Sequence, residues 1–419
     1  MPLVADKEKI MIAVSEAKQK IVDALCALPQ VRTALAEASG KTLASAVYAL
    51  YDIPAFPQSA MDGYAFTFNE WKPGILLPIE GEVRAGNPGE IKAVQGKAYR
   101  IFTGAPVPSG TDTVIMQEKI KIDGDLLLLQ DDQLRAGANV RPKGSEIRSG
   151  ELALGRDKLL TPAAIGFLAG IGINEVEVYP DPAISLIVTG DELQESGKQL
   201  QYGQVYESNS HTLIAALQQL GIRNIQVYRV KDELSALQDV LQISLTRSDL
   251  VLLTGGVSVG KYDFVTQAAA GCGVETVFHK VKQKPGKPLF FGTKNNKPMF
   301  GLPGNPSSVL TCFYEYVVDA IGILTRRNLS LPVVYAPIIG RYSKKAGLTH
   351  FLKAHYDGAN VTLLDAQESY RMRSFAKANC IVKLEEGAKG EEGKGEVDWW
   401  EEGAIVEVHL IGMGGFGYD

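Results

Sequence analysis

The segment ISLIVTGDEL, residues 184–193, decides how the central part of this chain folds. Its short apolar run ends abruptly in Thr-Gly-Asp-Glu, a pattern typical of a buried strand that is followed by a polar loop. Similar apolar runs recur up to residue 301, with helical patterns between them. We expect strands at 184–189, 225–230, 250–254, 274–279, 289–291 and 298–301, and helices at 208–220, 233–246, 264–270 and 306–324. This alternation predicts a doubly wound, mainly parallel α/β sheet.

The segments on either side of this region show other patterns. Residues 5–28 carry apolar side chains three and four positions apart before Pro29, which predicts an amphipathic helix with an apolar face available for pairing. A second helical stretch is expected at 33–48, followed at about 76–122 by short β-like segments between Gly, Pro and Asn turns. Residues 331–419 are again β-like. The chain is therefore predicted to be a multidomain α/β plus β protein.

The composition narrows the class of partner. The 419 residues carry 43 basic and 48 acidic side chains, a net charge of −5, so any bound anion must meet a local basic cluster, and a strongly cationic nucleic-acid binder is excluded. No apolar run approaches the roughly 20 residues of a membrane span, and the first residues lack the apolar stretch of a signal peptide. The 4 cysteines have no CxxC pair, which indicates a reducing compartment. We expect a cytoplasmic protein that binds neither nucleic acid nor membrane.

The ends of the expected strands are rich in polar, glycine and proline residues. TGDEL follows the first strand, VKDEL the second, TGGVSVGKYD the third, HKVKQKPGKP the fourth and GLPGNPSS the last. In an open parallel sheet, ligands bind beyond the carboxyl ends of the strands. Several such loops at one edge predict a binding site there.

Two of these loops offer backbone N–H groups to an anion. Gly255 and Gly256 permit a turn whose N–H groups point at a phosphate, although an ordinary strand-to-helix turn is the alternative. Asn305 is expected to cap a helix that starts at Pro306, which leaves N–H groups at a helix N-terminus. A well-capped buried helix explains this second pattern equally well.

The loop after the fourth strand carries a cluster of lysines. Its cationic residues are Lys280, Lys282, Lys284 and Lys287. The sequence Pro-Gly-Lys-Pro stiffens this loop, so we interpret the cluster as a preset cradle for phosphate or another oxyanion rather than as a solvated charge run.

Acidic residues at the same edge require a counter-charge. Glu192, Asp232 and Asp263 would each repel a nearby phosphate by roughly 4 kcal/mol at 4 Å and an effective dielectric near 20. Mg²⁺ resolves the conflict, because it is usually held by one or two carboxylates plus phosphate oxygens. Asp232 and Asp263 also stand just before expected helices, so capping remains an alternative for either. The histidines show no metal-ligand spacing, and no GxSxG or HExxH motif is present.

Longer motifs give the chain a resemblance to a known family. PAFPQSAMDGYAF, RIFTGAPVPSGTDTVIMQE, RPKGSEIRSG, TGDEL, TGGVSVGKYD, KPGKP and GLPGNPSS occur in an order and spacing that resemble the molybdopterin molybdotransferases, which include the bacterial MoeA proteins and the gephyrin E domain. The resemblance implies a homodimer with an elongated first domain in two pieces (1–50 and 144–179), a small β domain inserted in it (51–143), an α/β molybdopterin-binding domain (180–330) and a C-terminal β domain (331–419). It also implies a reaction in which molybdate is inserted into adenylylated molybdopterin with Mg²⁺-dependent release of AMP.

The resemblance also assigns roles to individual residues. The implied catalytic carboxylates are Asp62, Glu192, Asp232 and Asp263. The implied substrate-binding residues are Thr189, Gly190, Gly255, Gly256, Ser258, Lys280, Lys284, Lys287, Pro303, Asn305, Pro306 and Ser308. The implied Mg²⁺ ligands are Asp232, Asp263, Glu192 and Glu146. Glu146 stands where the family often has Asp, which places its carboxylate about one methylene further out. Asp62 lies outside the α/β domain, so the resemblance implies a cleft built between domains.

Two other functions stay open. A molybdopterin adenylyltransferase shares the TGG-containing domain and would consume ATP, but it does not need the other domains or Asp62. A non-catalytic scaffold of the gephyrin kind is disfavoured by the retained carboxylates. Contact with the adenylyltransferase is a further expected partnership. The sequence does not distinguish molybdate from tungstate, and the Gly/Glu/Lys-rich stretch near 385–403, expected to be a hairpin or loop, has no assigned role.

Overall fold

The computed structural model describes residues 11–86, 88–256, 264–385 and 397–411. They divide into two compact units. The main unit comprises Met1–Val31, Gly40–Thr42 and Glu177–Asp419, and the small unit comprises Arg32–Ser39 and Leu43–Val176.

The main unit is built on a six-stranded sheet. Its strands, in spatial order, are β17 (Ile225–Val230), β14 (Ile184–Thr189), β18 (Leu250–Thr254), β22 (Lys297–Leu302), β21 (Pro288–Lys294) and β19 (Glu275–Lys280). The first four are parallel, whereas β21 is antiparallel to both of its neighbours. Strand β21 is longer than expected because Asn295 and Asn296, both at positive φ, form a tight turn that pairs it with β22. The predicted mainly parallel α/β sheet is confirmed.

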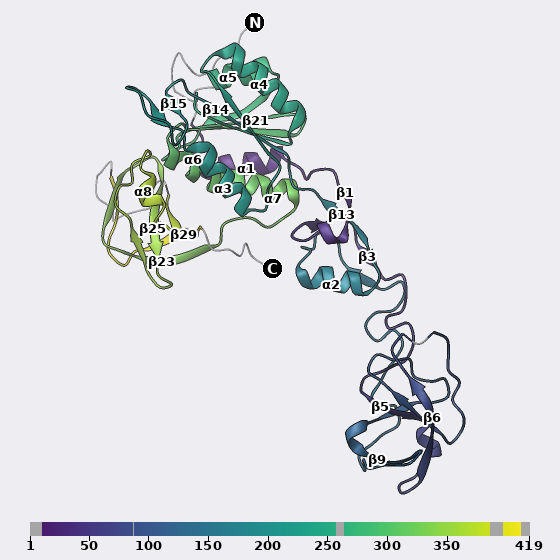
Figure 1. The fold of residues 1–419 in the computed structure, drawn as a ribbon. Coiled ribbons are helices and arrows are strands. Elements are labelled where there is room, and N and C mark those ends of the chain that lie inside the picture. The colour runs from purple at the N-terminus through teal and green to yellow at the C-terminus, as the bar shows by residue number, and fades with distance from the viewer. Residues whose placement is uncertain (1–10, 87, 257–263, 386–396, 412–419) are drawn as a thin grey trace. The chain divides into compact units, whose positions relative to one another are not determined.

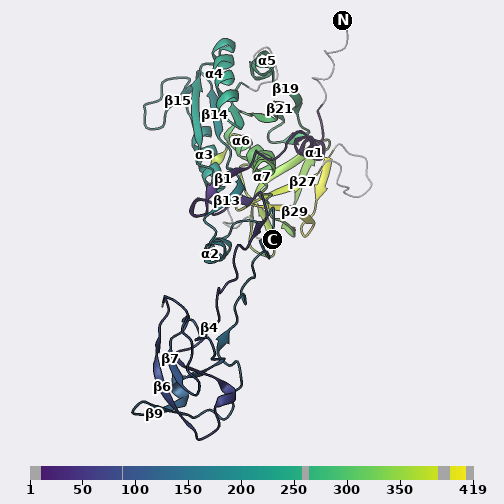
Figure 2. The same ribbon diagram turned by 90° about the vertical axis from the view of Figure 1, so that its right-hand side faces the viewer.

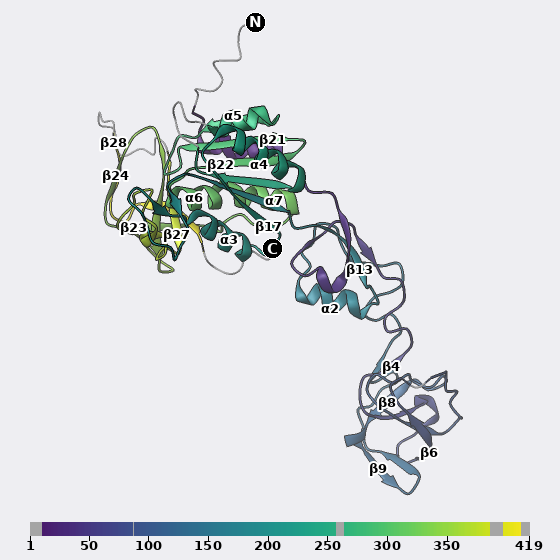
Figure 3. The same cartoon turned by 45° about the horizontal axis from the view of Figure 1, so that its top comes forward.

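Helices cover both faces of this sheet (Figure 1). The helices of this unit are α1 (Val14–Ala24), α3 (Asn209–Gln219), α4 (Leu234–Arg247), α5 (Phe264–Gly271), α6 (Pro306–Cys312) and α7 (Val318–Thr325). Ile187 packs with α4 and α5, while its neighbours Leu186 and Val188 pack with the other helices. Figure 3 shows α3, α6 and α7 on their shared side of the sheet. Successive side chains of the strand therefore pack into two separate cores, one on each face of the sheet, as a doubly wound sheet requires.

The N-terminal part differs from expectation in two ways. Helix α1 is shorter than the expected 5–28, and residues 1–10 lie outside the described part. Its apolar stripe of Val14, Ala17 and Ile21 is buried in this chain's own core, so the expectation of a free face for pairing is wrong. The expected helix at 33–48 is also wrong, because the stretch holds only one short 3-10 turn, Leu35–Glu37, between short strands that pair with other strands. Its strands are β1 (Val31–Ala34), β2 (Thr42–Leu43) and β3 (Val47–Tyr48).

Helices α6 and α7 are joined by a π-helical turn, Phe313–Val317, into one helical run. By length and composition, Pro306–Thr325 is apolar enough to cross a membrane, which the sequence analysis did not expect. Most of this run is buried inside the protein, as in a core helix.

A buried network of charged side chains connects the strand β29 (Ile405–Leu410) to this helical run. The fully buried Glu315 places Oε1 2.7 Å from His409 Nδ1 and Oε2 3.1 Å from Lys18 Nζ. His409 Nε2 lies 2.8 Å from Glu407 Oε1. Burial alone would lower the pKa of His409, but the two carboxylates outweigh burial and raise it. Burial alone would raise the pKa of Glu315, but Lys18 and His409 outweigh it and lower that pKa.

We expect the free energy of unfolding to fall as the pH rises above neutrality. The pKa of His409 is higher in the folded chain than in the unfolded chain, where it is about 6.5. Its contribution to stability is therefore fully present below about pH 6.5 and is lost as the pH rises through the folded-state pKa. Each pKa unit of difference corresponds to about 1.4 kcal/mol. The Glu315 contribution has the opposite sign and declines only as the pH falls below about 4.5. Urea unfolding between about pH 6 and 9 measures the effect, which His409→Gln should remove; equal slopes in both proteins would contradict it.

The small unit contains mainly β structure. Its largest sheet has the order β8 (Thr113–Met116), β5 (Gly63–Phe66), β7 (Ala98–Ile101), β6 (Leu76–Val83), β10 (Leu126–Leu129) and β9 (Ile120–Asp123). Figure 2 labels β6, β7 and β9 of this sheet. Two short ribbons pair β4 (Gln58–Ser59) with β11 (Val140–Arg141), and β3 with β12 (Leu152–Leu154). Helix α2 (Pro162–Gly170) begins after Thr161, whose Oγ1 accepts a hydrogen bond from the Ala164 N–H, and β13 (Glu175–Tyr179) pairs with β1 and β2.

The C-terminal strands of the main unit form a small barrel. Strands β25 (Thr349–Tyr356), β26 (Val361–Leu363), β23 (Val333–Ile339), β29 and β27 (Cys380–Leu384) pair in that order, and β27 closes the ring on β25. Beside them lie β24 (Tyr342–Lys345), which pairs with β28 (Val397–Trp400), and the short helix α8 (Met372–Phe375). Strand β28 is the described end of the Gly/Glu/Lys-rich stretch. The expected β structure of 331–419 is therefore confirmed for its described residues.

Candidate active site

Three loops at the carboxyl edge of the main sheet meet at Asp232. Thr189, the last residue of β14, donates from Oγ1 to Asp232 Oδ1 at 3.2 Å. A Cβ built on Gly256 would lie 3.5 Å from the same carboxylate oxygen and 3.3 Å from Thr189 Cγ2. The structure therefore brings together residues from β14, β17 and β18 that the sequence analysis selected separately.

The first glycine of the turn after β18 allows this approach. Gly255 has φ +89°, and a Cβ on it would lie 2.1 Å from the Thr189 carbonyl oxygen. No side chain fits at that distance, so glycine is required by both conformation and space. Gly190 is less constrained, since its Cβ would meet only the ends of the Glu192 and Leu193 side chains, at 2.9 Å and 3.0 Å, and these can move away.

Asp232 does not cap the helix that follows it. The N-cap of α4 is Glu233, and no side chain makes a capping hydrogen bond there. The Asp232 backbone N–H instead donates to Asp191 Oδ1 at 3.4 Å, an acceptor to which the sequence analysis gave no role. The capping alternative for Asp232 is therefore wrong.

The donor set at this edge fits a hard cation. Within the described residues, Asp191, Glu192 and Asp232 form no ion pair with a lysine or arginine, and no three potential ligands cluster into a complete metal site. One or two free carboxylates are what Mg²⁺ uses when substrate phosphates supply its other ligands. Asp263 and Ser258, also assigned to this site, lie outside the described residues.

The PGNP loop (residues 303–306) follows β22 and adjoins the glycine turn. A Cβ on Gly304 would lie 4.0 Å from Gly255 Cα. Asn305 occupies the N-cap of α6, but the expected capping hydrogen bond is absent there. Its Nδ2 donates instead to Ser369 Oγ at 2.9 Å. Pro306 starts the helix as expected, and Ser308 is only 2% exposed.

The lysine loop is a tightly braced turn. The Val281 N–H donates to the Lys287 carbonyl at 3.1 Å, and the buried Gln283 donates from Nε2 to the Gly286 carbonyl at 3.1 Å. A Cβ on Gly286 would lie 2.5 Å from Cys312 Sγ, so this turn also requires glycine. These contacts are consistent with the expected stiffening of the loop by Pro-Gly-Lys-Pro.

The lysines of this turn keep their charge available. Among the described residues, no carboxylate pairs with Lys280, Lys284 or Lys287. Lys284 lines a cavity of about 460 Å³ together with His350 and Ser369. Burial, helped by the positive charge of Lys284, lowers the pKa of His350 to about 4, so this imidazole is neutral at neutral pH. The positive charge of the cavity wall comes from the lysine.

Asp62 and Glu146 belong to the small unit. Asp62 Oδ1 accepts hydrogen bonds from the Thr103 N–H at 2.7 Å and the Thr103 hydroxyl at 2.8 Å, and these two bonds lower the pKa of the exposed Asp62. Gly63 must follow it, because a Cβ there would lie 1.8 Å from the Ile115 carbonyl oxygen. Glu146 lies on the loop that pairs with Ile53. The Thr103 contact was missed, although RIFTGAP was among the quoted motifs.

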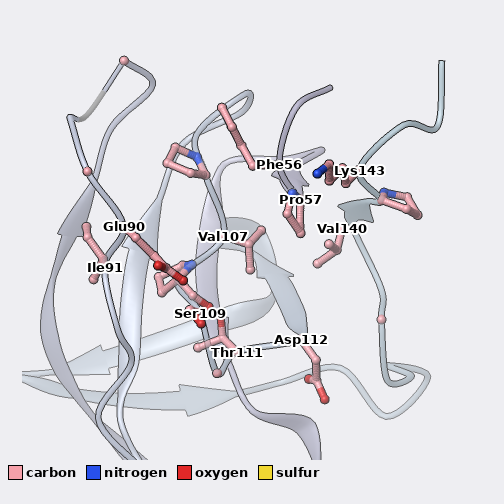
Figure 4. A pocket seen from close by; sticks show the side chains of 17 residues that line it. Phe56, Pro57, Glu90, Ile91, Val107, Ser109, Thr111, Asp112, Val140 and Lys143 are labelled. Atoms are coloured by element: carbon pink, nitrogen blue, oxygen red, sulfur yellow. Dashed lines mark hydrogen bonds between the residues drawn. The ribbon is translucent and has the colours of Figure 1, made fainter. Parts of the chain in front are cut away.

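A cavity of about 970 Å³ in the small unit was also missed (Figure 4). Phe56, Val107 and Val140 give it apolar walls, and Glu90 and Lys143 lie on opposite sides. None of the predicted site residues lines it. Most of its walls come from three of the motifs that carry the family resemblance: PAFPQSAMDGYAF supplies Phe56 and Pro57, RIFTGAPVPSGTDTVIMQE supplies residues 106–112, and RPKGSEIRSG supplies Pro142 and Lys143. These motifs were a signal, but only the tertiary structure shows that they enclose one cavity.

The fold and the site together define a class: a multidomain α/β protein with a polar site at the carboxyl edge of an open sheet. Three family models match the chain and identify the family within this class. The MoeA N-terminal region (domain I and II) matches residues 12–172, the probable molybdopterin binding domain matches 185–322 and the MoeA C-terminal region (domain IV) matches 336–411.

Individual proteins agree with these matches. A molybdopterin molybdenumtransferase of Haemophilus influenzae is 33% identical over 384 residues, 90% of this chain and 95% of that protein. One of Staphylococcus aureus is 30% identical over 391 residues, 90% and 93% respectively. Two solved structures of MoeA proteins from Pyrococcus horikoshii have TM-scores of 0.78 and 0.74 at 26% identity; they cover 96% of this chain, which covers 99% and 100% of theirs. The chain belongs to the molybdopterin molybdenumtransferase family.

Proposed function

We propose that this protein inserts molybdate into adenylylated molybdopterin with Mg²⁺-dependent release of AMP. Membership of the family makes the chain a transferase of molybdenum cofactor biosynthesis. The observation that carries the finer proposal is the meeting of the Asp232 carboxylate with the glycine turn at the carboxyl edge. A carboxylate next to a turn suited to phosphate is the arrangement that a metal-assisted cleavage of a phosphoanhydride needs.

The chain's own residues have separate roles in this proposal. Gly190, Gly255 and Gly256 let the backbone approach the phosphates, with Thr189 holding Asp232 in place. Lys280, Lys284 and Lys287 neutralise anionic groups, and Ser258 adds a hydroxyl. Asp232 and Asp263 hold Mg²⁺, helped by Glu192 and Glu146. When bound, Mg²⁺ stabilises negative charge that develops on the phosphate oxygens.

The PGNP loop and the Lys284 cavity are proposed to receive the oxyanion. Asn305 connects the loop to this cavity through its hydrogen bond to Ser369, and Lys284 supplies the positive charge. Pro303, Pro306 and Ser308 are proposed to help shape the same oxyanion site. Tungstate is also a tetrahedral dianion and is expected to compete.

The remaining parts of the proposal concern the domains, the oligomeric state, the location and the partners of the protein. We propose the four domain boundaries given by the resemblance, a homodimer, a cytoplasmic location and contact with the adenylyltransferase that supplies the substrate. The homodimer is proposed because Asp62 lies outside the α/β domain that carries the other site motifs. Light scattering at micromolar concentration tests it, and a fully active monomer would exclude it.

Lys284→Ala and Lys287→Ala should raise the KM for substrate more than they lower stability. Each lysine is exposed on a turn that other residues brace, so truncation should change the free energy of unfolding by under about 0.5 kcal/mol. Losing one charge-assisted contact to an anion should weaken binding by about 10-fold. Lys345→Ala, an exposed lysine on β24, is the matched control. A large fall in melting temperature with unchanged KM would show that the turn is structural.

The direct test is an assay of AMP. Purified protein is incubated with adenylylated molybdopterin and Mg²⁺, with and without molybdate, and AMP is measured. Molybdate-dependent AMP release supports the proposal. Consumption of ATP with molybdopterin would support the adenylyltransferase alternative instead, and the absence of both activities would favour a scaffold.

A further inference from the structure

The PGNP loop is held on two sides by amide side chains. On one side, Asn209 Nδ2 donates to the Gly304 carbonyl at 2.9 Å. On the other side, Asn305 Nδ2 donates to Ser369 Oγ at 2.9 Å. The first of these contacts joins α3 to the loop after β22, across 95 positions of sequence. The position of the loop therefore depends on a residue that belongs to none of the quoted motifs.

Helix α3 does not need the Asn209 side chain for its own start. The N-cap is Ser208, whose side chain makes no capping hydrogen bond. The first turn is instead capped by the buried Glu207, which accepts from the Ser210 N–H at 2.8 Å and also from the Ser210 hydroxyl. Asn209 is thus free to turn its amide toward the loop.

The polar groups around this contact are only partly satisfied. Among the described residues, the buried Asn209 Oδ1 has no hydrogen-bond partner. The buried hydroxyls of Thr254, before the glycine turn, and Ser307, after the PGNP loop, also lack partners. An unsatisfied buried group lowers stability, so the Asn209 side chain is not placed here for stability alone.

Gly304 connects this contact to the site. The backbone of Gly304 lies next to Gly255: a Cβ built on Gly304 would be 4.0 Å from the Gly255 Cα. A shift of Gly304 would therefore disturb the glycine turn as well as the wall of the oxyanion site. Displacements of about 1 Å in a positioning element can lower a rate by about 100-fold.

We propose that Asn209 is a positioning residue that holds the PGNP loop in its substrate-binding conformation, a role that rests on the proposed function. It touches no reacting atom and acts through the Gly304 carbonyl. Asn209→Leu keeps the size of the side chain and removes the hydrogen bond. It should raise the KM for molybdate at least 10-fold in the AMP assay while the melting temperature stays close to wild type.

A matched control lies one turn along the same helix. Thr212 donates from Oγ1 to the Ser208 carbonyl at 2.9 Å, a bond that stays within α3. Thr212→Val should leave the KM for molybdate unchanged. Asn209→Asp, which keeps the polarity but loses the donor, should behave like Asn209→Leu and serves if the apolar variant does not fold.

Hydrogen exchange gives a readout that needs no activity. Amides of Ser307 and Val309, which donate to Ser369 and Asn305 carbonyls, should exchange faster in Asn209→Leu than in wild type or Thr212→Val. Unchanged exchange, or an unchanged molybdate KM in an active protein, would overturn the inference. A large loss of melting temperature with unchanged KM would do the same. Wild type that releases no AMP would reject the proposed function, and exchange alone would then decide whether Asn209 holds the loop.

Discussion

Asp232→Asn should slow AMP release at least about 100-fold while the protein stays folded. The amide keeps the size of the side chain and can still accept the hydrogen bond from Thr189. It removes the negative charge that a hard cation requires. Metal stabilisation of developing phosphate charge is worth several kcal/mol, so losing the metal is expected to affect the rate far more than the fold. AMP release across several Mg²⁺ concentrations, together with thermal melting, measures both effects.

Asp239→Asn is the matched control for this substitution. Asp239 is an exposed acid on α4, the helix that follows Asp232. Its variant should retain wild-type turnover and wild-type Mg²⁺ dependence. We also expect Asp263→Asn to behave like Asp232→Asn, since both are assigned to the same cation. Wild-type turnover in folded Asp232→Asn would remove this residue from the mechanism.

Gly255→Ala should lower activity and stability together. The added Cβ would lie 2.1 Å from the Thr189 carbonyl oxygen, so the turn or the end of β14 must move. Overpacking of this kind costs about 1–3 kcal/mol, and the positive φ adds strain. Because Thr189 also holds Asp232, the displacement should reach the carboxylate, and turnover should fall by more than about 100-fold.

Gly197→Ala separates the two causes. Gly197 has the same φ of +89°, but no atom lies within 4 Å of its Cβ position. Its variant should carry the backbone strain alone, about 1–2 kcal/mol, and keep its activity. Equal effects of the two substitutions on turnover would contradict the close approach at Gly255. Urea unfolding and the AMP assay on both variants make the comparison.

The local sequence pattern correctly predicted secondary-structure elements whose formation depends on neighbouring residues. The strand Ile184–Thr189 and the helix start at Pro306 were placed correctly, because apolar periodicity and proline act over a few residues. The stretch 33–48 was misread as helix. Its alanines and leucines favour helix locally, but pairing with strands elsewhere in the chain overrides that preference.

The sequence by itself determined the order of strands and helices along the α/β region and predicted which loops carry the chemistry, since glycine, lysine and aspartate at strand ends are recognised by residue type. Only the tertiary structure decided their partners: Thr189 for Asp232, Thr103 for Asp62 and Ser369 for Asn305, separated by 43, 41 and 64 positions. Such hydrogen bonds depend on how separate elements pack, and packing places side chains to within a fraction of an ångström. No local pattern contains that information, because either partner alone looks like an ordinary polar residue.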